Sequence, residues 1–143
     1  MLVSQILKTK GDMVFTASPQ ETVAAAAALL MTRRVGAMVI LDADESVVGI
    51  LSERDIVRIV AEQGAPGLNM PLSACMSRDV IFAGPTETAD SLLERMTDRR
   101  IRHLPVVRDG RLVGIVSIGD LVKSKIAETE AEAKTLKDYI SAG

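Results

Sequence analysis

The sequence predicts an α/β fold made of two copies of a β-α-β-β-α unit. The first observation is an internal repeat, because residues 49–55 return as residues 114–120, 65 positions later. The second is the alternation of short Val- and Ile-rich runs with longer stretches of helical pattern, which is typical of sheets covered by helices. The third is size: a unit of about 60 residues buries apolar surface poorly by itself, so the two copies are expected to share one core.

The first copy is predicted as follows. Residues 14–17 form a short strand, and Ser18-Pro19 breaks it. A helix follows over residues 20–34, with Pro19 at its start, where a proline is tolerated. Two apolar strands, residues 37–41 and 47–51, surround an acidic turn and indicate a hairpin. Ser52 then caps a second helix from residue 53 to about residue 63, which Gly64 ends.

The second copy is predicted to have the same order. Its elements are a strand at residues 80–83, a helix at 86–100, strands at 104–107 and 112–116, and a helix from residue 118 onward. The repeats are expected to span residues 2–64 and 72–125, with a Gly- and Pro-containing loop at 65–71 and a helical tail at 126–143. Each repeat begins with a short helical lead-in.

The tail carries a stripe of positions spaced by four and three residues. These are Val122, Ile126, Thr129, Ala133, Leu136 and Ile140. Such spacing favours contact with another chain through a coiled-coil-like seam. The alternative is a helix that packs on its own domain or is solvated beyond Ile126.

The composition argues against several classes of function and location. Aromatic residues make up only 2% of the chain, which leaves almost no stacking platform for single-stranded nucleic acid, and a net charge of −2 disfavours binding to a phosphodiester backbone. The longest apolar run, residues 23–31, is too short to cross a bilayer, so no membrane association is expected. A single cysteine allows no internal disulfide, and the first residues lack a signal-peptide pattern; both favour a cytoplasmic location.

The repeated motif, G-h-h-S-x-x-D with h apolar, has two readings. It comprises Gly49, Ser52 and Asp55 in the first copy and Gly114, Ser117 and Asp120 in the second. One carboxylate at a strand-to-helix corner is able to hold both hydroxyls of a ribose, while the helix N-terminus presents N–H groups to an anion. The alternative is a capping box, in which the serine and aspartate satisfy local backbone donors. Duplication of the motif in matching contexts favours binding.

The chain resembles a tandem pair of cystathionine β-synthase (CBS) domains, also called a Bateman module. The resemblance rests on the paired motif, the phrase at residues 102–107 followed by residues 109–117, and the prolines Pro19 and Pro85, and it covers Leu2 to about Lys125. It implies two repeats related by a pseudo-twofold axis, a homodimer, and a non-catalytic sensor or energy-sensing regulatory role. The implied ligands are AMP, ADP, ATP, S-adenosylmethionine or NAD(H), and the regulated protein partner is unidentified.

The resemblance also assigns site residues. Asp55 and Asp120 are expected to bind ribose, with Ser52 and Ser117 beside them. The adenine edge is expected at Val14, Phe15 and Thr16 with Ala37, Met38 and Val39, and in the second copy at Val80, Ile81 and Phe82 with His103, Leu104 and Pro105. Cations for phosphate are expected from Arg54, Arg102 and His103, although a lone histidine is equally consistent with a structural hydrogen bond. The first copy lacks the basic pair of residues 102 and 103, so unequal sites are expected.

Catalysis is not expected. The sequence has one histidine and one cysteine far apart, no cluster with metal-ligand spacing, and no G-x-G-x-x-G after a strand. The remaining alternative is a structural dimerisation module whose clefts are vestigial.

Overall fold

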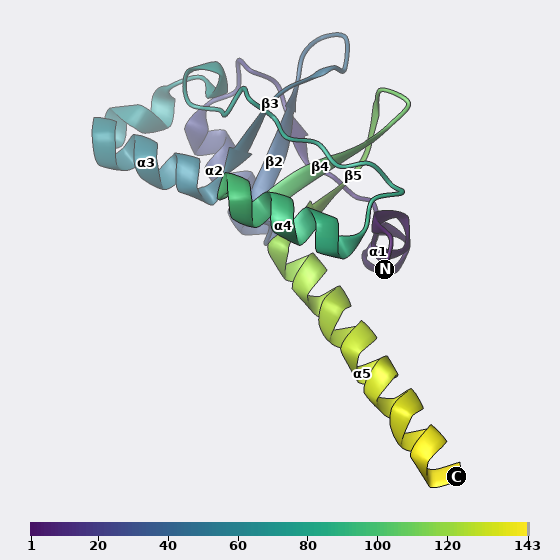
Figure 1. Cartoon of the computed structure of the whole chain (residues 1–143). Helices are drawn as coiled ribbons and strands as arrows, with labels where there is room; N and C mark the ends of the chain where they lie inside the picture. The colour runs from purple at the N-terminus through teal and green to yellow at the C-terminus, as the bar shows by residue number, and fades with distance from the viewer. Residues whose placement is uncertain (143) are drawn as a thin grey trace. The chain divides into compact units, whose positions relative to one another are not determined.

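The computed structural model describes residues 1–142, which form two compact units (Figure 1). The central unit is Met13–Ile81. The discontinuous unit combines residues 1–12 with the chain from Phe82 onward. The units therefore differ from the repeats expected from sequence, because the lead-in segment of each repeat packs in the unit that holds the other repeat's strands.

The central unit contains a three-stranded sheet and two helices. In chain order it has β1 Thr16–Ala17, α2 Val23–Arg33, β2 Ala37–Leu41, β3 Val47–Ser52 and α3 Glu53–Gln63, then the short 3-10 turns η1 Ala65–Asn69 and η2 Leu72–Ala74. The strand order is β1-β2-β3, with β1 parallel and β3 antiparallel to β2. The predicted hairpin, α3 and its Gly64 end are confirmed.

The discontinuous unit contains a two-stranded antiparallel hairpin and three helices. Its elements are α1 Val3–Lys10, α4 Ala89–Arg99, β4 His103–Arg108, β5 Arg111–Ser117 and α5 Ile118–Ala142. The predicted hairpin and the long last helix are confirmed. The N-terminal helix α1 packs against β5 and α5, although more than 100 residues separate them in the sequence (Figure 1).

The predicted first strand of the second copy is wrong, and that of the first copy is shorter than expected. Residues 80–83 contain no strand, only a bridge from Ala83 to Val106. In the first copy, Val39 N–H donates to Phe15 O over 3.1 Å. The equivalent of Val39, 66 positions on, is Pro105, which has no N–H to donate. The second copy therefore lacks the donor that pairs the first copy's opening strand.

Both long helices of the repeats begin later than predicted. Thr22 and Thr88 are the N-caps of α2 and α4, and their hydroxyls accept N–H bonds from Ala25 and Ser91 at 3.2 and 3.1 Å. Pro19 thus lies before the helix rather than in its first turn. A threonine hydroxyl satisfies a free N–H, which a proline ring is unable to do.

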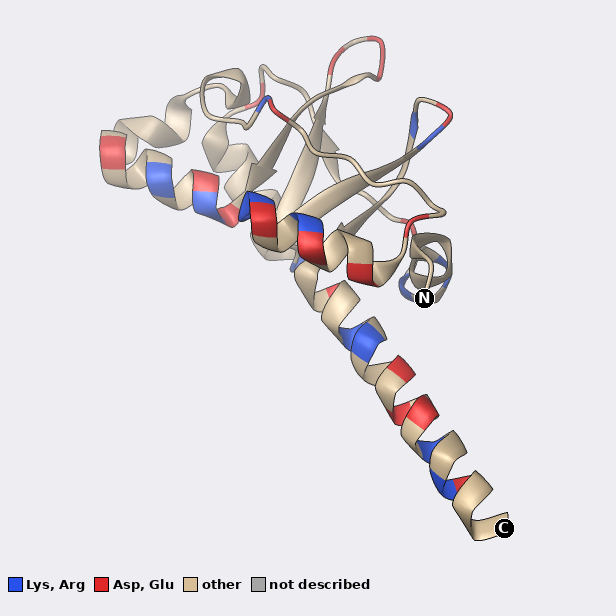
Figure 2. Ribbon diagram, in the orientation of Figure 1, with Lys and Arg blue, Asp and Glu red and all other residues tan. Residues whose placement is uncertain are grey.

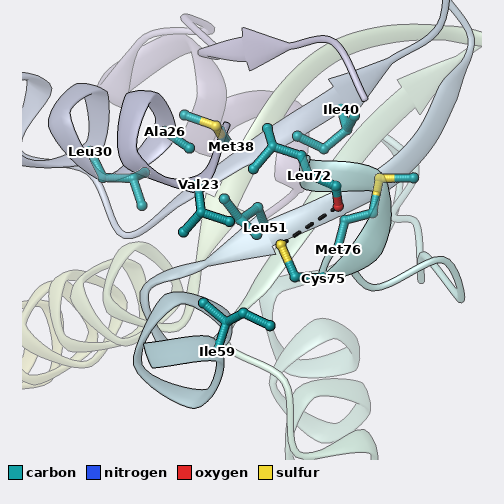
Figure 3. Close-up of a cluster of buried hydrophobic side chains, with 10 residues drawn as sticks. All are labelled: Val23, Ala26, Leu30, Met38, Ile40, Leu51, Ile59, Leu72, Cys75 and Met76. Carbon is teal, nitrogen blue, oxygen red and sulfur yellow. Dashed lines mark hydrogen bonds between the residues drawn. The ribbon is translucent and has the colours of Figure 1, made fainter. Parts of the chain in front are cut away.

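The core of the central unit lies between α2, the sheet and the segment after η1 (Figure 3). Its fully buried members include Val23 of α2, Met38 and Leu51 of the sheet, and Leu72. Cys75 is also buried, and its thiol lies 3.7 Å from Leu72 O. Burial raises the pKa of the Cys75 thiol, and the nearby charge of Asp55 adds to the rise, so this cysteine is held in its unreactive form.

The motif glycines are explained by packing of the lead-in segments. A Cβ on Gly49 would lie 2.6 Å from Met76 Sδ, and one on Gly114 would lie 2.7 Å from Leu7 Cδ2. The close approach that these glycines permit is therefore made by protein side chains. Each lead-in segment inserts one large apolar side chain over the glycine in the second strand of a hairpin.

Candidate strand-to-helix sites

The second corner, where β5 runs into α5, holds Asp120 in a network of donors. Its Oδ2 accepts the Ser117 N–H and the Lys10 ammonium, each at 2.8 Å. Lys10 Nζ also donates to Ile115 O at 2.7 Å. The Ser117 hydroxyl in turn accepts the Asp120 N–H at 3.1 Å, which completes the capping arrangement. Lys10 therefore connects α1 to the corner.

Asp120 remains partly open in spite of these bonds. Its side chain is 25% exposed, and among the described residues no hydrogen bond reaches its Oδ1. Partial burial raises the pKa of Asp120, but the hydrogen bonds from Lys10 and Ser117 outweigh it and leave the pKa below its usual value. The carboxylate is thus charged at neutral pH and keeps an acceptor oxygen for another donor.

The first corner, where β3 runs into α3, is closed. Asp55 is 5% exposed, and its Oδ2 accepts both the N–H and the hydroxyl of Ser52, at 2.8 and 3.2 Å. Its Oδ1 accepts from Arg58 Nη1 at 2.9 Å, and Arg58 Nη2 also donates to Cys75 O at 3.1 Å. Both carboxylate oxygens are therefore occupied within the central unit.

The capping alternative is realised at both corners, but the cations differ. In the first copy the cation is Arg58 of the same helix; its equivalent in the second copy, Lys123, forms no ion pair among the described residues. Sequence reasoning missed both Arg58 and Lys10. The spacing of Asp55 and Arg58 was a usable signal, since side chains three residues apart share a helix face. No local signal pointed from Asp120 to Lys10.

The residues predicted to read an adenine edge in the first copy do lie together. Phe15 and Thr16 pair with β2, and Ala37, Met38 and Val39 are buried. The Arg33 guanidinium lies over the Phe15 ring, 5.4 Å from its centre. The backbone of Phe15 and Thr16 is therefore already paired with β2, and the Phe15 ring is in contact with Arg33. Val14, the neighbouring residue, is half-buried.

The residues predicted to read an adenine edge in the second copy are divided between the two units. Val80 and Ile81 belong to the central unit, whereas Phe82, His103 and Pro105 belong to the discontinuous unit. Phe82 is 40% exposed, and its carbonyl accepts from Arg95 Nη1 at 2.9 Å. Arg95 also pairs with Glu87, and the hydrogen bond from Arg95 lowers the pKa of Glu87. Leu104 and Pro105 are buried in β4.

The predicted phosphate cations lie near the helix starts. Arg54 is exposed on the first turn of α3, and Arg102 is exposed just before β4. The Arg102 carbonyl accepts the Ile118 N–H at 2.8 Å, which ties the basic pair to the start of α5. His103 is half-buried and engaged in an interaction. In the first turn of α5, the N–H groups of Ile118 and Asp120 donate to Arg102 O and to the Ser117 hydroxyl. Among the described residues, the N–H of Gly119 has no such acceptor and lies next to Asp120 in the chain.

A pocket of about 360 Å³ opens elsewhere on the discontinuous unit. It is lined by Ser4, Leu7, Lys8, Gly11, Asp12, Pro85, Arg108 and Val113. None of the predicted site residues lies in it. Within residues 1–142 there is no group of three His, Cys, Asp or Glu side chains placed to hold a metal ion. No described helix is long and apolar enough to span a membrane.

Solved structures resemble this chain over most of its length. The CBS-domain containing protein ATU1752 from Agrobacterium tumefaciens is 44% identical, with a TM-score of 0.85 over 87% of this chain and 92% of that one. The CBS protein PAE2072 from Pyrobaculum aerophilum, complexed with AMP, is 30% identical, with a TM-score of 0.75 over 84% and 89%. The CBS domain pair of protein MJ0100, in complex with 5'-methylthioadenosine and S-adenosyl-L-methionine, is 28% identical, with a TM-score of 0.80 over 90% and 98%.

The family model for the CBS domain matches twice, at residues 3–62 and 72–126. The matches cover both hairpins, both corners and both lead-in segments, which are the elements that the internal repeat predicted. The chain therefore belongs to the CBS-domain family and carries two CBS domains in tandem.

Proposed function

We propose that this chain is a non-catalytic regulatory module that binds an adenine nucleotide, and that the corner at Asp120 holds its ribose. The observation that carries the proposal is the charged, partly exposed Asp120 carboxylate with one oxygen outside the local network. Two adjacent ribose hydroxyls are donors that suit such an acceptor. Structures of similar CBS proteins with AMP, or with S-adenosylmethionine and methylthioadenosine, support an adenosine-containing ligand.

The surroundings of Asp120 suit a ligand that carries negative charge. Lys10 places an ammonium 2.8 Å from the carboxylate, and the Gly119 N–H lies at the positive end of α5. Arg102 is exposed and tied by its carbonyl to the same helix start. These groups supply donors for ribose oxygen or phosphate, which favours AMP, ADP, ATP or NAD(H) as the ligand class.

The corner at Asp55 is not proposed to bind ribose in the same way. Its carboxylate is buried and saturated by Ser52 and Arg58, so a ligand would have to break the Arg58 pair first. The competing function, a structural dimerisation module, is favoured by this closed corner. A ligand acts as a regulator only if it binds one arrangement of the module more tightly than another.

Calorimetric titration separates the two functions. AMP, ADP, ATP, NADH and S-adenosylmethionine are titrated into the wild-type chain, into Asp120→Asn and into the matched control Asp55→Asn. We expect Asp120→Asn to weaken binding of the preferred nucleotide roughly 10- to 100-fold, because it removes the charge that accepts the ribose hydroxyls. Asp55→Asn should keep the affinity while lowering the melting temperature, since it leaves Arg58 without its carboxylate.

Two results would contradict the proposal. Absence of binding by every adenine compound at millimolar concentration supports the structural module instead. Equal loss of affinity in both variants, with unchanged circular dichroism, removes the assignment of the ribose to Asp120.

A further inference from the structure

The helix α5 carries an uncovered apolar stripe. Every residue from 129 to 142 is exposed, and the helix continues well past the hairpin and α4 (Figure 1). On this stripe Val122, Ile126, Leu136 and Ile140 are 44%, 54%, 60% and 68% exposed. Large aliphatic side chains repeated on one face of an exposed helix indicate a surface that is covered by a partner.

The stripe is separate from the face that α5 uses in its own unit. Leu121 and Ser124 are buried against that unit, Lys125 pairs with Asp90 of α4 at 3.0 Å, and Glu128 pairs with the terminal amine of Met1. At about 100° per residue, Leu121, Ser124 and Glu128 lie roughly 100–160° from the centre of the stripe, whereas Lys125 lies at its edge, about 60° away. Both faces are therefore able to be occupied at once.

We propose that the occupant is a second copy of this chain, whose α5 lies parallel and in register to form a two-stranded coiled coil. The spacing assigns Ile126, Ala133 and Ile140 to heptad position a, and Val122, Thr129 and Leu136 to position d. Isoleucine at a with leucine at d is the combination that favours parallel two-stranded coils. The last heptad, with Leu136 and Ile140, has this combination.

The flanking charges decide the orientation. Lys125 and Glu132 fall at position g, and Glu130 and Lys137 fall at position e. In a parallel pair, Glu132 faces Lys137 of the partner subunit. Lys125, at the edge of the stripe, lies between Asp90 of its own unit and Glu130 of the partner subunit, so both flanking pairs attract. In an antiparallel pair that matches the apolar layers, Glu132 faces Glu132 of the partner subunit, and Lys123 faces the partner's Lys137. Only the parallel arrangement avoids repulsion (Figure 2 shows the basic and acidic stretches along α5).

The middle of the seam is shallow. Thr129 and Ala133 bury less than leucine or isoleucine, and exposed ion pairs contribute weakly. The association is therefore concentration-dependent and weakens with salt, since the flanking pairs are screened. This inference is independent of nucleotide binding.

Charge reversal tests the pairing by sedimentation velocity. Glu132→Lys and Lys137→Glu should each weaken dimerisation roughly 10-fold, because each replaces attraction by repulsion on both sides of the coil. The combined variant should restore dimerisation. Matched controls on other faces of the helix, Asp138→Lys and Lys134→Glu, should leave it unchanged. A combined variant that stays monomeric, or a wild-type chain that is monomeric at several hundred micromolar, overturns the proposal.

Disulfide trapping tests the orientation. Cys75 is buried and is the sole cysteine of the sequence, so an introduced cysteine is the reactive thiol. Leu136→Cys should form a disulfide-linked dimer under mild oxidation, because position d faces itself across a parallel seam. Asp138→Cys, which points away from the seam, should not. Crosslinking of Leu136→Cys only with Ile126→Cys would instead establish the antiparallel arrangement and overturn ours.

Discussion

At the scale of single residues, identical motifs have different surroundings. Ser52 and Asp55 match Ser117 and Asp120, and each aspartate accepts the N–H of its serine at 2.8 Å. The cations next to the aspartates come from different places, from the same helix in one copy and from α1 in the other. The motif thus determines the backbone conformation where the strand meets the helix. The residues packed around it determine whether the aspartate carboxylate remains accessible.

The glycine of the first motif gives a residue-scale prediction. Gly49→Ala should lower the free energy of unfolding by about 1–3 kcal/mol, because the added methyl group would collide with Met76 and crowd the Ser77 carbonyl oxygen, 3.1 Å away. Urea denaturation measures the change.

Gly119→Ala is the contrasting variant. Its Cβ would meet no atom closer than 3.6 Å, and it lies in the first turn of α5, so the substitution should raise stability by a few tenths of a kcal/mol. Equal destabilisation by both variants would show that the Met76 contact is not what requires glycine at position 49.

At the scale of elements, the hairpins and α3 were predictable from sequence to within about a residue. Alternating apolar runs around turn residues define β2 and β3, and Ser52 and Gly64 mark the ends of α3. The opening strand was predicted in both copies, but it is short in the first and absent in the second. Such a strand consists of few backbone bonds, and whether they form depends on the N–H groups of the neighbouring strand. The helix starts were missed because Pro19 and Pro85 are conspicuous, whereas the caps are the plainer threonines 22 and 88.

The caps give an element-scale prediction. Thr88→Ala should lower the free energy of unfolding by about 1 kcal/mol, since the Ser91 N–H loses its acceptor. Thr86→Ala is the matched control, because Thr86 is exposed and precedes the helix. Thermal and urea unfolding of the two variants should differ; equal stabilities would mean that the cap contributes nothing measurable.

At the scale of the whole molecule, sequence identified the two corners but not the groups around them. Ser117 and Asp120 were identified because their motif occurs twice in the sequence. Arg58 could have been identified from its spacing of three residues from Asp55 on a predicted helix. Lys10 could not, because 110 positions separate it from Asp120 and only the packing of α1 on β5 brings them together. The same packing explains why the compact units exchange their lead-in segments relative to the repeats.

The packing of each lead-in segment in the unit of the other repeat gives a prediction for the molecule as a whole. Leu7 is buried and covers Gly114, so Leu7→Ala should cost about 2–5 kcal/mol and loosen the discontinuous unit first. Hydrogen exchange should accelerate in β5 and α4 more than in β2 and β3. Met31→Ala, at an 80% exposed site, is the control and should change neither. Faster exchange in the central unit alone would contradict this view of the units.

The route of the chain through the two units also sets an order of synthesis. The ribosome makes the helix Val3–Lys10 first, yet that helix has nowhere to dock until the strand Arg111–Ser117 has emerged. The uninterrupted stretch Met13–Ile81 has the contacts within its own unit available much earlier. During translation the middle of the protein is therefore ready to fold before its beginning, and cutting the gene between the repeats would give two products that each lack the lead-in segment their strands require.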